Sequence, residues 1–517
     1  MARHPGAPWG KWQPEGFWIP KSWFESRRGS GAGRHACGCD REGAMSYSTA
    51  VIVLAAGEGK RLKSHLPKVL HRLAGRSLLG HVLTALEEVP VDRRIVVVSP
   101  RRDEIASALE QEGVASRVEL VVQESPRGTG DAVRVALEAL AGEIPSHVLV
   151  VPGDGPLIEP ATLNMLLEEH TDSGAKATVL TAVAPDPSGY GRVVRRAGGE
   201  IDRIVEERDA TSEELGIDEI NSSIYVFDTS DLAGMLEKVD RENSQGEHYL
   251  TDVIGLLRSN DERVALARAP IDEVRGANTR AELAQVAALL RNRACERLML
   301  EGVTIVDPKN TYIDPTVVVG RDATVLPFTL LEGKTTVGEG AEIGPQVRIV
   351  DSEIGERARV TYAVVRESVV GPEASVGPFA SLRPGSKLGR GAEIGTFVET
   401  KNTVLGDDSD AHHLAYLGDA EIGSGVNIGA GTITCNWDGQ RKHRTVIGDD
   451  AYISSDTMLV APVRLGDRSA TGAGAVVRDD VPDDALAVGI PARVIEGKGN
   501  RMKRGRESRT EKGGGAT

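Results

Sequence analysis

The chain divides into two parts that differ in the spacing of their hydrophobic residues. From about residue 49 to 275, short β-branched runs alternate with longer segments of helical spacing. The expected strands are Ala50–Leu54, Arg94–Val98, Val118–Val122, His147–Val151 and Ala177–Val183, and the expected helices are Leu78–Glu88, Arg102–Gln111, Asp131–Ala141 and Pro160–Glu169. Strands that alternate with helices form mostly parallel sheets. We therefore expect an α/β domain over residues 45–278.

The longest segment free of Gly and Pro follows this domain. Arg280–Glu301 is rich in Ala, Leu and Arg and has helical spacing. It predicts a linker helix over 279–301, although an ordinary packed helix of the first domain would have the same pattern.

After residue 302 the spacing changes to one aliphatic residue in every six. This period fits neither a helix nor a hairpin and is typical of a left-handed parallel β-helix, in which six residues form one side of a triangular coil. A glycine-rich β-sandwich would instead alternate with period two. We therefore expect a β-helix of hexapeptide repeats over 302–497. The periodic residues are Val319, Val325, Leu331, Val337, Ile343, Ile349, then Val370, Val376, Leu382, Leu388, Ile394, then Leu417, Ile422, Ile428, then Ile447, Ile453, Leu459 and Leu465, and many of them precede Gly.

Two segments interrupt the six-residue period, 407–416 (DDSDAHHLAY) and 435–444 (CNWDGQRKHR). Loops that leave a regular scaffold are common places for binding and catalytic side chains. We predict that both segments are ejected from the coil and carry a site.

Composition limits the classes of function. The net charge is −15, and the two ends, 1–44 and 498–517, together contribute +8, so the middle of the chain is near −23. This balance excludes general nucleic-acid binding, which needs a basic stripe. Residues 1–44 are expected to be a disordered extension and 498–517 a basic flexible tail. The sequence contains no run of about 20 apolar residues, which is the length that would predict a membrane span.

Cysteine usage points to a reducing compartment. The four cysteines, Cys37, Cys39, Cys295 and Cys435, provide no disulfide framework, and the start of the chain lacks a secretory pattern. We expect a cytoplasmic protein.

The first strand is followed by a loop suited to phosphate. The sequence runs Leu54-Ala55-Ala56-Gly57-Glu58-Gly59-Lys60-Arg61 and continues to Pro67-Lys68. Small residues after a strand let the backbone approach a nucleotide, and two cations lie within reach. The loop is neither a dinucleotide-binding nor a P-loop motif, because position 62 is Leu and no Gly-Lys-Ser/Thr follows.

This loop resembles the signature of nucleoside-diphosphate-sugar pyrophosphorylases, and within them the N-acetylglucosamine-1-phosphate uridylyltransferases. The resemblance implies a Rossmann-like nucleotidyltransferase domain with Mg²⁺ as cofactor. It places Arg61 and Lys68 on the triphosphate as catalytic cations and Asp154 and Asn278 on the metal. It implies nucleotide and sugar contacts at Leu54, Ala55, Ala56, Gly57, Gln123, Gly128, Thr129, Gly153, Gly191, Glu206 and Asn221. Pro152 stands where members of the family often have Tyr.

Polar residues at and between the two interruptions resemble the acetyltransferase half of a bifunctional enzyme family. These runs are His413-Leu414-Ala415-Tyr416, Asn427–Thr432 and Cys435–Gly439. An imidazole is a suitable base for amide formation, and His413 is the candidate. The adjacent His412 is a second histidine that we do not expect to act as the base. The resemblance implies a glucosamine-phosphate site at Arg383, Lys401, Tyr416 and Asn427, and an acetyl-CoA site at Ala430, Asn436, Trp437, Ser455 and Ala473. Ile490 departs from the Arg-bearing end common in the family.

Together the two resemblances imply an enzyme that carries out two steps in the synthesis of UDP-N-acetylglucosamine. This compound is a precursor of the bacterial cell wall. The expected substrates of the enzyme are acetyl-CoA, glucosamine 1-phosphate, UTP and N-acetylglucosamine 1-phosphate, and the resemblance implies a homotrimer. The alternative is a monofunctional nucleotidyltransferase whose β-helix only assembles trimers.

Overall fold

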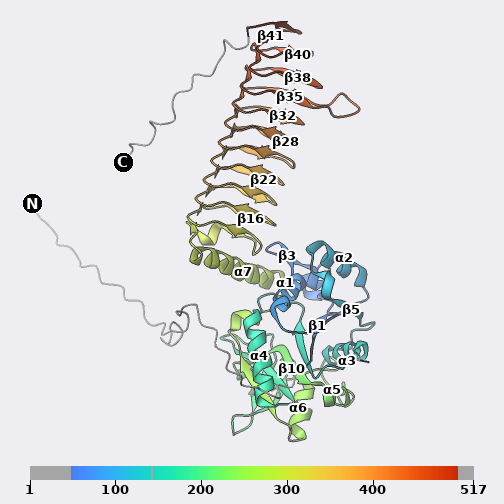
Figure 1. The fold of residues 1–517 in the computed structure, drawn as a ribbon. Coiled ribbons are helices and arrows are strands. Elements are labelled where there is room, and N and C mark those ends of the chain that lie inside the picture. Colours follow the sequence, from blue (N-terminus) through green and yellow to red (C-terminus); the bar gives the residue numbers. More distant parts are fainter. Residues whose placement is uncertain (1–47, 141, 143, 499–517) are drawn as a thin grey trace, which may run out of the picture. The chain divides into compact units, whose positions relative to one another are not determined.

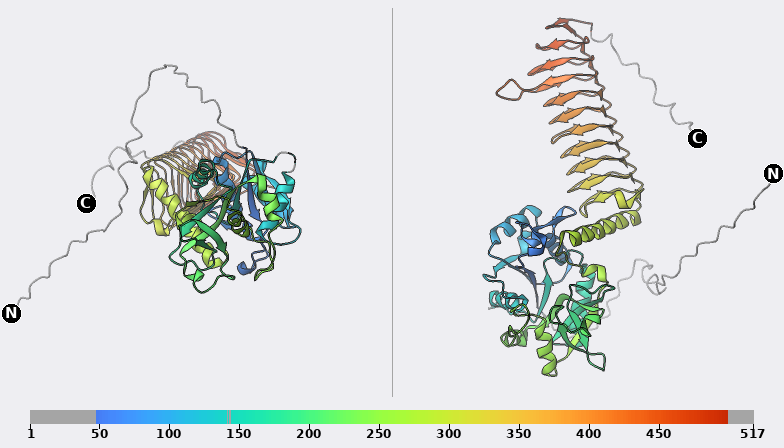
Figure 2. Two further views of the ribbon diagram at one scale, coloured as in Figure 1. Left: turned by 90° about the horizontal axis from the view of Figure 1, so that it is seen from below. Right: turned by 180° about the vertical axis from the view of Figure 1, so that it is seen from behind.

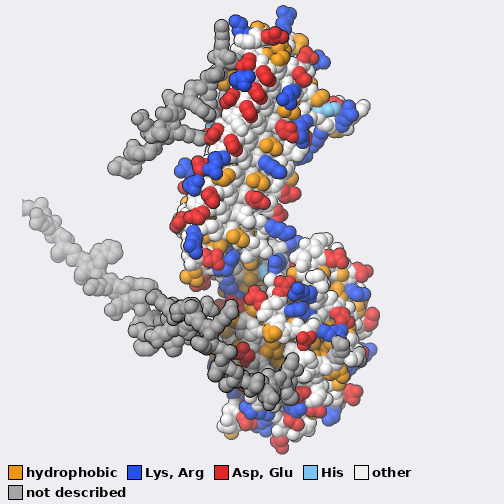
Figure 3. Space-filling model, in the orientation of Figure 1, with side chains coloured by type: hydrophobic (Ala, Val, Ile, Leu, Met, Phe, Trp, Pro, Cys, Tyr) orange, Lys and Arg blue, Asp and Glu red, His pale blue; other side chains and the backbone are white. Residues whose placement is uncertain are grey.

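The computed structural model describes residues 48–140, 142 and 144–498. The predicted extension 1–44 and nearly all of the predicted tail 498–517 lie outside these residues. In the described part, no helix is both long enough and apolar enough to cross a membrane. On the face seen in Figure 3, acidic and basic side chains of the described residues are interspersed.

A mixed sheet forms the centre of the first domain (Figure 1). Its main strands are β1 (Thr49–Ala55), β4 (Arg93–Val98), β5 (Glu119–Val122), β6 (His147–Pro152), β7 (Ala177–Val183), β10 (Glu219–Asp228) and β11 (Val264–Arg268). They lie in the order β11-β7-β10-β6-β1-β4-β5, and only β10 runs antiparallel to its neighbours. The five predicted strands are confirmed, with shifts of at most one residue at their ends.

Helices cover both faces of this sheet. They are α1 (Leu78–Ala85), α2 (Arg102–Glu112), α3 (Thr129–Ala139), α4 (Pro160–Ser173), α5 (Thr229–Leu236) and α6 (Asp252–Ser259). Successive residues of β1 point to opposite faces: Val51 and Val53 join one buried cluster, and Ala50 and Ile52 join the other. This two-sided burial explains why the strand has no polar alternation. Helix α3 begins two residues before its predicted start, after Gly128, whose φ is 106°.

The predicted long helix is α7 (Arg280–Leu300). Val286 and Leu290 in its first half pack in a cluster with Leu78 and Leu157 of the α/β domain. Cys295 and Leu298 in its second half belong to the hydrophobic interior of the coil. The helix therefore packs along its length, and its buried side changes partner halfway.

From β12 (Thr304–Ile305) onward, short parallel strands stack into three sheets, which are the faces of the predicted β-helix (Figure 2). The first face includes β27 (Glu393–Thr396), β30 (Asp410–His413), β33 (Asn427–Ile428), β36 (Tyr452–Ile453) and β39 (Ala470–Thr471). The second includes β25 (Ala380–Leu382), β28 (Glu399–Lys401), β31 (Tyr416–Gly418) and β34 (Ile433–Cys435), and the third includes β29 (Val404–Leu405), β32 (Ala420–Ile422) and β35 (Thr445–Ile447). The coil ends in an antiparallel hairpin of β41 (Leu486–Gly489) and β42 (Ala492–Ile495).

The glycines after the periodic aliphatic residues have a steric cause. A Cβ on Gly338 would lie 2.5 Å from the backbone nitrogen of Glu356 in the next coil, and one on Gly371 would lie 2.5 Å from the carbonyl oxygen of Gly389. Successive coils therefore approach too closely at this position for any side chain. The aliphatic-Gly pairs follow from that close approach.

One of the two predicted interruptions is wrong. Residues 407–416 are not ejected, because β30 and β31 occur within them in regular register with their neighbours. Leu405, Ala411 and Leu417 occupy successive inward positions and are fully buried. The period was hidden because Ala411 fills an inward position where a larger aliphatic residue was expected.

The second interruption is confirmed. Residues 436–444 connect β34 to β35 as a loop that projects from the coil (Figure 1). The register resumes beyond it, with Glu421 paired to Val446.

Aspartates at one corner of the coil tie successive coils together. Asp483 Oδ1 accepts a hydrogen bond of 3.0 Å from the backbone N–H of Asp467, and Asp467 Oδ1 accepts one of 3.0 Å from Asp449. Asp449 Oδ1 accepts in turn from the backbone N–H of Ser424 at 2.8 Å. The corner thus satisfies backbone donors that the turns would otherwise leave to water.

We predict that Asp467→Ala lowers the free energy of unfolding of the coil by about 1 kcal/mol, because it removes one side-chain acceptor for a backbone donor. Asp467→Asn keeps the acceptor oxygen and is the matched control, with a smaller loss. Urea unfolding followed by circular dichroism measures the difference, and equal losses in both variants would contradict the role of the acceptor.

Candidate functional site

The loop after β1 packs against Lys68, one of the two predicted phosphate ligands. Gly59 has a φ of 64°, and a Cβ there would lie 2.6 Å from Cβ of Lys68. Leu62 is buried and anchors the short turn Lys60–Leu62, so the exposed Arg61 sits on a fixed base. Leu54 and Ala55 end the strand below. The predicted cations Arg61 and Lys68 therefore project from a loop that is held in place by close packing at Gly59 and by the buried Leu62.

Lys68 brings together the two predicted metal ligands. Its Nζ donates a hydrogen bond of 2.6 Å to Oδ1 of Asn278 and forms an ion pair with the carboxylate of Asp154. These residues are 210 and 86 positions away in sequence from Lys68, so the fold alone makes them neighbours. Their oxygens converge on a single positive charge.

The start of α7 positions Asn278. Thr279 is the N-cap residue, and its Oγ1 accepts from the backbone N–H of Glu282. The Glu282 carboxylate accepts in return from the Thr279 hydroxyl and from the backbone N–H of Asn278 at 2.8 Å. This reciprocal capping box fixes the backbone at the helix start. Asn278 is therefore held by the same bonds that begin the helix.

A buried aspartate orients Gln123, the predicted uracil contact. Nε2 of Gln123 donates to Oδ2 of Asp131 at 2.8 Å and to the carbonyl of Gly128 at 3.2 Å. Burial opposes ionisation of Asp131, but hydrogen bonds from Gln123 and Arg134 outweigh it and hold the pKa of the carboxyl below its ordinary value. An ionised carboxylate only accepts hydrogen bonds. The Gln123 amide must therefore keep its NH₂ toward Asp131 and its oxygen outward.

The segment 246–251 clamps the loop at the start of α3. A Cβ on Gly128 would lie 2.4 Å from the carbonyl oxygen of His248, and that oxygen accepts from the backbone N–H of Gly130. Oγ1 of Thr129 accepts from the backbone N–H of Leu250. Gly128 and Thr129 are thus fixed from two sides.

Three strands bring the predicted sugar contacts together. Arg192 of β8 (Arg192–Arg195) pairs with Val205 of β9 (Ile201–Val205) and with Ile220 of β10. The predicted contacts each lie one residue from one of these paired positions: Gly191, Glu206 and Asn221. The backbone N–H of Asn221 donates to the carbonyl of Gly191 at 2.9 Å. The register of these strands therefore brings the three residues close together.

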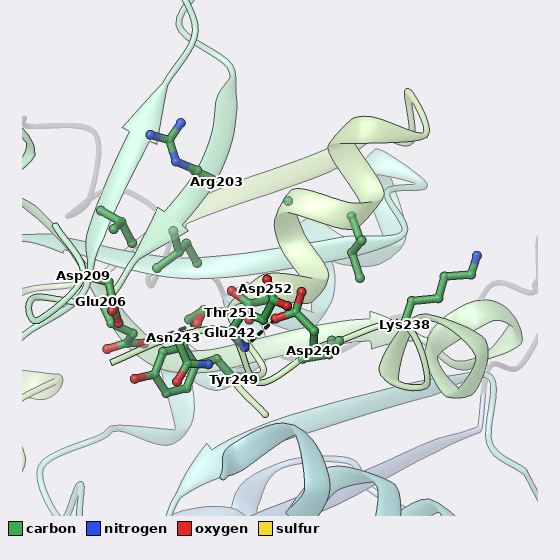
Figure 4. A pocket seen from close by; sticks show the side chains of 15 residues that line it. Arg203, Glu206, Asp209, Lys238, Asp240, Glu242, Asn243, Tyr249, Thr251 and Asp252 are labelled. Carbon is green, nitrogen blue, oxygen red and sulfur yellow. Dashed lines mark hydrogen bonds between the residues drawn. The ribbon is translucent and has the colours of Figure 1, made fainter. Parts of the chain in front are cut away.

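Glu206 also lines a cavity of about 400 Å³ between β9, α6 and the segment 238–243 (Figure 4). Its Oε1 accepts from the Thr251 hydroxyl at 3.3 Å, and burial raises the pKa of Glu206. Asp252 lies beside it in the same cavity, and burial, followed by the charges of Asp240 and Asp209, raises the pKa of Asp252 to about 6. The wall beside the predicted sugar contact is therefore acidic, and burial together with the neighbouring carboxylates disfavours ionisation of Asp252.

In the coil, four of the predicted acetyltransferase residues form a column at one corner. His413, Ala430, Ser455 and Ala473 each follow an inward-facing residue of the first face by two positions, in four successive coils. Among the described residues, the backbone N–H of Ala430 donates to no acceptor. The corner thus places an exposed imidazole above a backbone donor in the next coil.

Three cations lie close together on the second face of the coil. Lys442 of the ejected loop, followed by Arg383, lowers the pKa of Lys401 because the like charges are close. Arg383 forms a 2.7 Å ion pair with Glu399, and Tyr416 lies one position after the inward Ala415 in the adjoining coil. Three cations at one place suit a dianionic phosphate. The sequence did not single out Lys442 as a site residue, although the loop that carries it was predicted.

Asp419 connects the ejected loop to the coil. Its Oδ2 accepts from Nδ2 of Asn436 at 2.6 Å and lies 4.0 Å from Nζ of Lys442. Asn436 is buried, whereas the predicted aromatic contact Trp437 is more than half exposed. Cys435 is half-buried, and burial raises the pKa of its thiol, which disfavours the reactive thiolate. Cys435 therefore resembles a packed residue more than a reactive nucleophile.

We predict that Asp252→Asn stabilises the α/β domain at pH 8 and changes its stability little at pH 4. The folded-state pKa of about 6 lies above the ordinary value of 3.8, so the folded state pays for ionising Asp252 as the pH rises through this window. Thermal unfolding at the two pH values measures the difference, with the exposed Asp172→Asn on α4 as control. A gain of equal size at both pH values would contradict the electrostatic cause.

Comparison with known proteins supports both halves of this picture. Residues 51–212 match the family model of the MobA-like NTP transferase domain. A bifunctional protein GlmU of Thermobifida fusca is 51% identical over 465 residues, which cover 89% of this chain and 96% of the relative. A GlmU of Streptomyces avermitilis is 48% identical over 85% of this chain and 91% of the relative, and one of Carboxydothermus hydrogenoformans is 46% identical over 84% and 96%. The chain belongs to the family of bifunctional GlmU proteins.

Proposed function

We propose that the chain catalyses two consecutive transfers. The coil moves an acetyl group from acetyl-CoA to glucosamine 1-phosphate, and the α/β domain moves a uridylyl group from UTP to the resulting N-acetylglucosamine 1-phosphate. The observation that carries this proposal is the presence of two separate polar constellations in a chain that matches GlmU relatives along nearly their whole length. Both cosubstrates are intracellular metabolites, so the enzyme is expected to act in the cytoplasm.

In uridylyl transfer, a phosphate oxygen of the sugar phosphate attacks the α-phosphorus of UTP, and the bond to pyrophosphate breaks. Positioning and charge neutralisation carry such reactions, and no covalent intermediate on the protein is needed. Arg61 and Lys68 hold the triphosphate, and Gly191, Glu206 and Asn221 hold the sugar. The outward oxygen of Gln123 accepts a hydrogen bond from N3–H of uracil, which cytosine lacks.

The residues around Lys68 fit a bound Mg²⁺. A carboxylate from Asp154 and an amide oxygen from Asn278 converge on the ammonium of Lys68, so the place already holds a positive charge between two hard oxygen donors. Asp154 and Asn278 would hold the ion, which would neutralise charge on the phosphates. Lys68 would then turn its ammonium to the triphosphate beside them.

In acetyl transfer, the amine nitrogen of the sugar attacks the thioester carbonyl, and the bond to the CoA sulfur breaks. His413 accepts the proton that the nitrogen loses, and the backbone N–H of Ala430 donates to the developing oxyanion. Arg383, Lys401 and Lys442 hold the phosphate. Tyr416 and Asn427 contact the sugar, and Asn436, Trp437, Ser455 and Ala473 contact acetyl-CoA.

The monofunctional alternative explains the coil only as an assembly device. It gives no reason for three cations to be held together at a cost in mutual repulsion, visible in the lowered pKa of Lys401. It also gives no reason for an exposed histidine to stand over a free backbone donor. A catalytic coil explains both.

We further propose that three chains associate through one corner of the coil. Large apolar residues stack there in left-handed conformation and are exposed: Phe328, Tyr362, Phe379, Phe397 and Leu414. The rings of Phe379 and Phe397 stack with centroids 5.7 Å apart. Gln346 holds this corner position in the coil between Phe328 and Tyr362, and the four residues from Tyr362 to Leu414 form an unbroken column. An exposed apolar column of this kind marks an interaction surface. His413 is adjacent to Leu414, so a second chain packed on this column would border the acetyltransferase residues.

The two activities should separate by mutation. His413→Ala is expected to lower acetyl transfer at least a hundredfold, because it removes the base, and to leave uridylyl transfer unchanged. Lys68→Met should do the reverse. Separate assays with acetyl-CoA plus glucosamine 1-phosphate, and with UTP plus N-acetylglucosamine 1-phosphate, test both. Acetyl transfer that persists in His413→Ala would reject the catalytic role of the coil in favour of the monofunctional alternative.

Assembly should depend on the apolar column. Phe379→Glu combined with Phe397→Glu is expected to convert the trimer into monomers, because it places charges within the buried contact. Light scattering measures the mass, and the exposed Val318→Glu on the third face is the control. Uridylyl transfer should survive in the monomer. A trimer that persists in the double variant would place the interface elsewhere.

A further inference from the structure

A line of outward-facing residues runs up the first face of the coil. Because Ile394, Ala411 and Ile428 point inward, the residues that precede them point outward in the same column: Glu393, Asp410 and Asn427. Outward residues on this coil are usually at least partly exposed. Asp410 is an exception, since only 1% of its surface is accessible.

Asp410 is held between a predicted sugar contact and a histidine. Its Oδ1 accepts a hydrogen bond of 2.5 Å from Nδ2 of Asn427 in the next coil. Nε2 of His412, two residues along the same strand, lies 3.6 Å from the same oxygen and 3.6 Å from Oε2 of Glu393 in the preceding coil. His412 is 40% exposed, so its ring lies over the aspartate on the solvent side.

This arrangement fixes which way the Asn427 amide faces. A carboxylate only accepts hydrogen bonds, so Asn427 must turn its NH₂ to Asp410. Its oxygen then points away from Asp410 and can accept a hydrogen bond. An amine or hydroxyl of the sugar is a donor that suits it.

We propose that Asp410 and His412 are positioning residues for acetyl transfer, which hold the Asn427 amide with its oxygen toward the amino group of the sugar. The inference rests on the proposed acetyltransferase function. An N–H of the neutral amine donates to Asn427 Oδ1, and this leaves the nitrogen lone pair directed at the thioester carbon. The nitrogen bonds to that carbon, the carbon–sulfur bond breaks, and His413 takes the proton.

His412 acts through Asp410. Its imidazole lies within ion-pair distance of two carboxylates from adjacent coils, and its ring centroid is 5.9 Å from that of His413. Gly395 in the preceding coil leaves room for it, because a Cβ there would lie 2.7 Å from Cα of His412. His412 thereby shields Asp410 from water and keeps its short bond to Asn427.

Steady-state kinetics on the full chain test the proposal. Asp410→Asn should lower kcat for acetyl transfer about tenfold, since two facing amides no longer fix the direction of Asn427. The KM for glucosamine 1-phosphate should change little, because orientation of the amine matters most in the transition state. His412→Gln, which leaves Asp410 in place, should lower kcat about threefold.

A double-mutant cycle separates positioning from a structural role. If Asp410 acts through Asn427, adding Asp410→Asn to Asn427→Ala should cost nothing further in kcat. Glu342→Gln is the matched control, because Glu342 occupies the same outward column in β18 (Glu342–Ile343), several coils away. It should retain full acetyl transfer, and uridylyl transfer should be unchanged in every variant.

Different results separate the two levels of inference. Losses that add in the double variant, or an Asp410→Asn enzyme with the wild-type kcat, would overturn the positioning role. If Asp410→Asn lost uridylyl transfer along with acetyl transfer, the variant would be unfolded. In that case His412→Gln tests the proposal, and a wild-type kcat in His412→Gln would overturn the positioning role. Wild-type enzyme that fails to acetylate glucosamine 1-phosphate would instead reject the proposed function itself.

Discussion

Backbone hydrogen bonds between successive coils decide which residues of the second half can share a site. Each strand pairs in register with the strand one coil before and after it, so a residue stacks on partners that lie 16 to 25 positions away in sequence. The inward aliphatic residues set this register, since a slip of one residue would turn them to solvent. A site on the coil is consequently a column. His413, Ala430, Ser455 and Ala473 become neighbours through stacking alone.

In the first half, the parallel sheet and the long helix bring residues that are distant in sequence together. The parallel strands β1 and β6 end at one edge of the sheet, which brings the loop of Gly57 and the loop of Asp154 together. The third partner, Asn278, comes from beyond the sheet and is delivered by the capping box of α7. The helix that packs on both parts of the chain therefore also supplies the third residue of the proposed nucleotide site. If that proposal holds, a change at Thr279 or Glu282 acts on uridylyl transfer through the backbone of Asn278.

Regular spacing made most of the fold predictable, and small side chains mark where prediction failed. The strands of the α/β domain and the coil were visible as periods of burial. Residues 407–416 were misjudged because Ala411 fills an inward position with a side chain that a search for Val, Ile or Leu does not detect. Motif residues such as Lys68 and Asp154 could be named in advance. Asp410 and Lys442 could not, because Asp410 meets Asn427 only through stacking between coils, and Lys442 approaches Lys401 only where the ejected loop lies against the coil.

In both halves, a carboxylate orients the side-chain amide of a neighbouring residue through a hydrogen bond. Gln123 and Asn427 carry amides whose two ends are nearly equal in size, so shape alone does not decide which end faces a ligand. In each case a buried carboxylate, Asp131 or Asp410, accepts from the NH₂ group and leaves the oxygen outward. Under the proposed function, the oxygen of Gln123 accepts from a base with a donor at N3, and the oxygen of Asn427 accepts from an amine. Selection of uracil and alignment of the amine would then depend on two carboxylates that act only through the amides they hold.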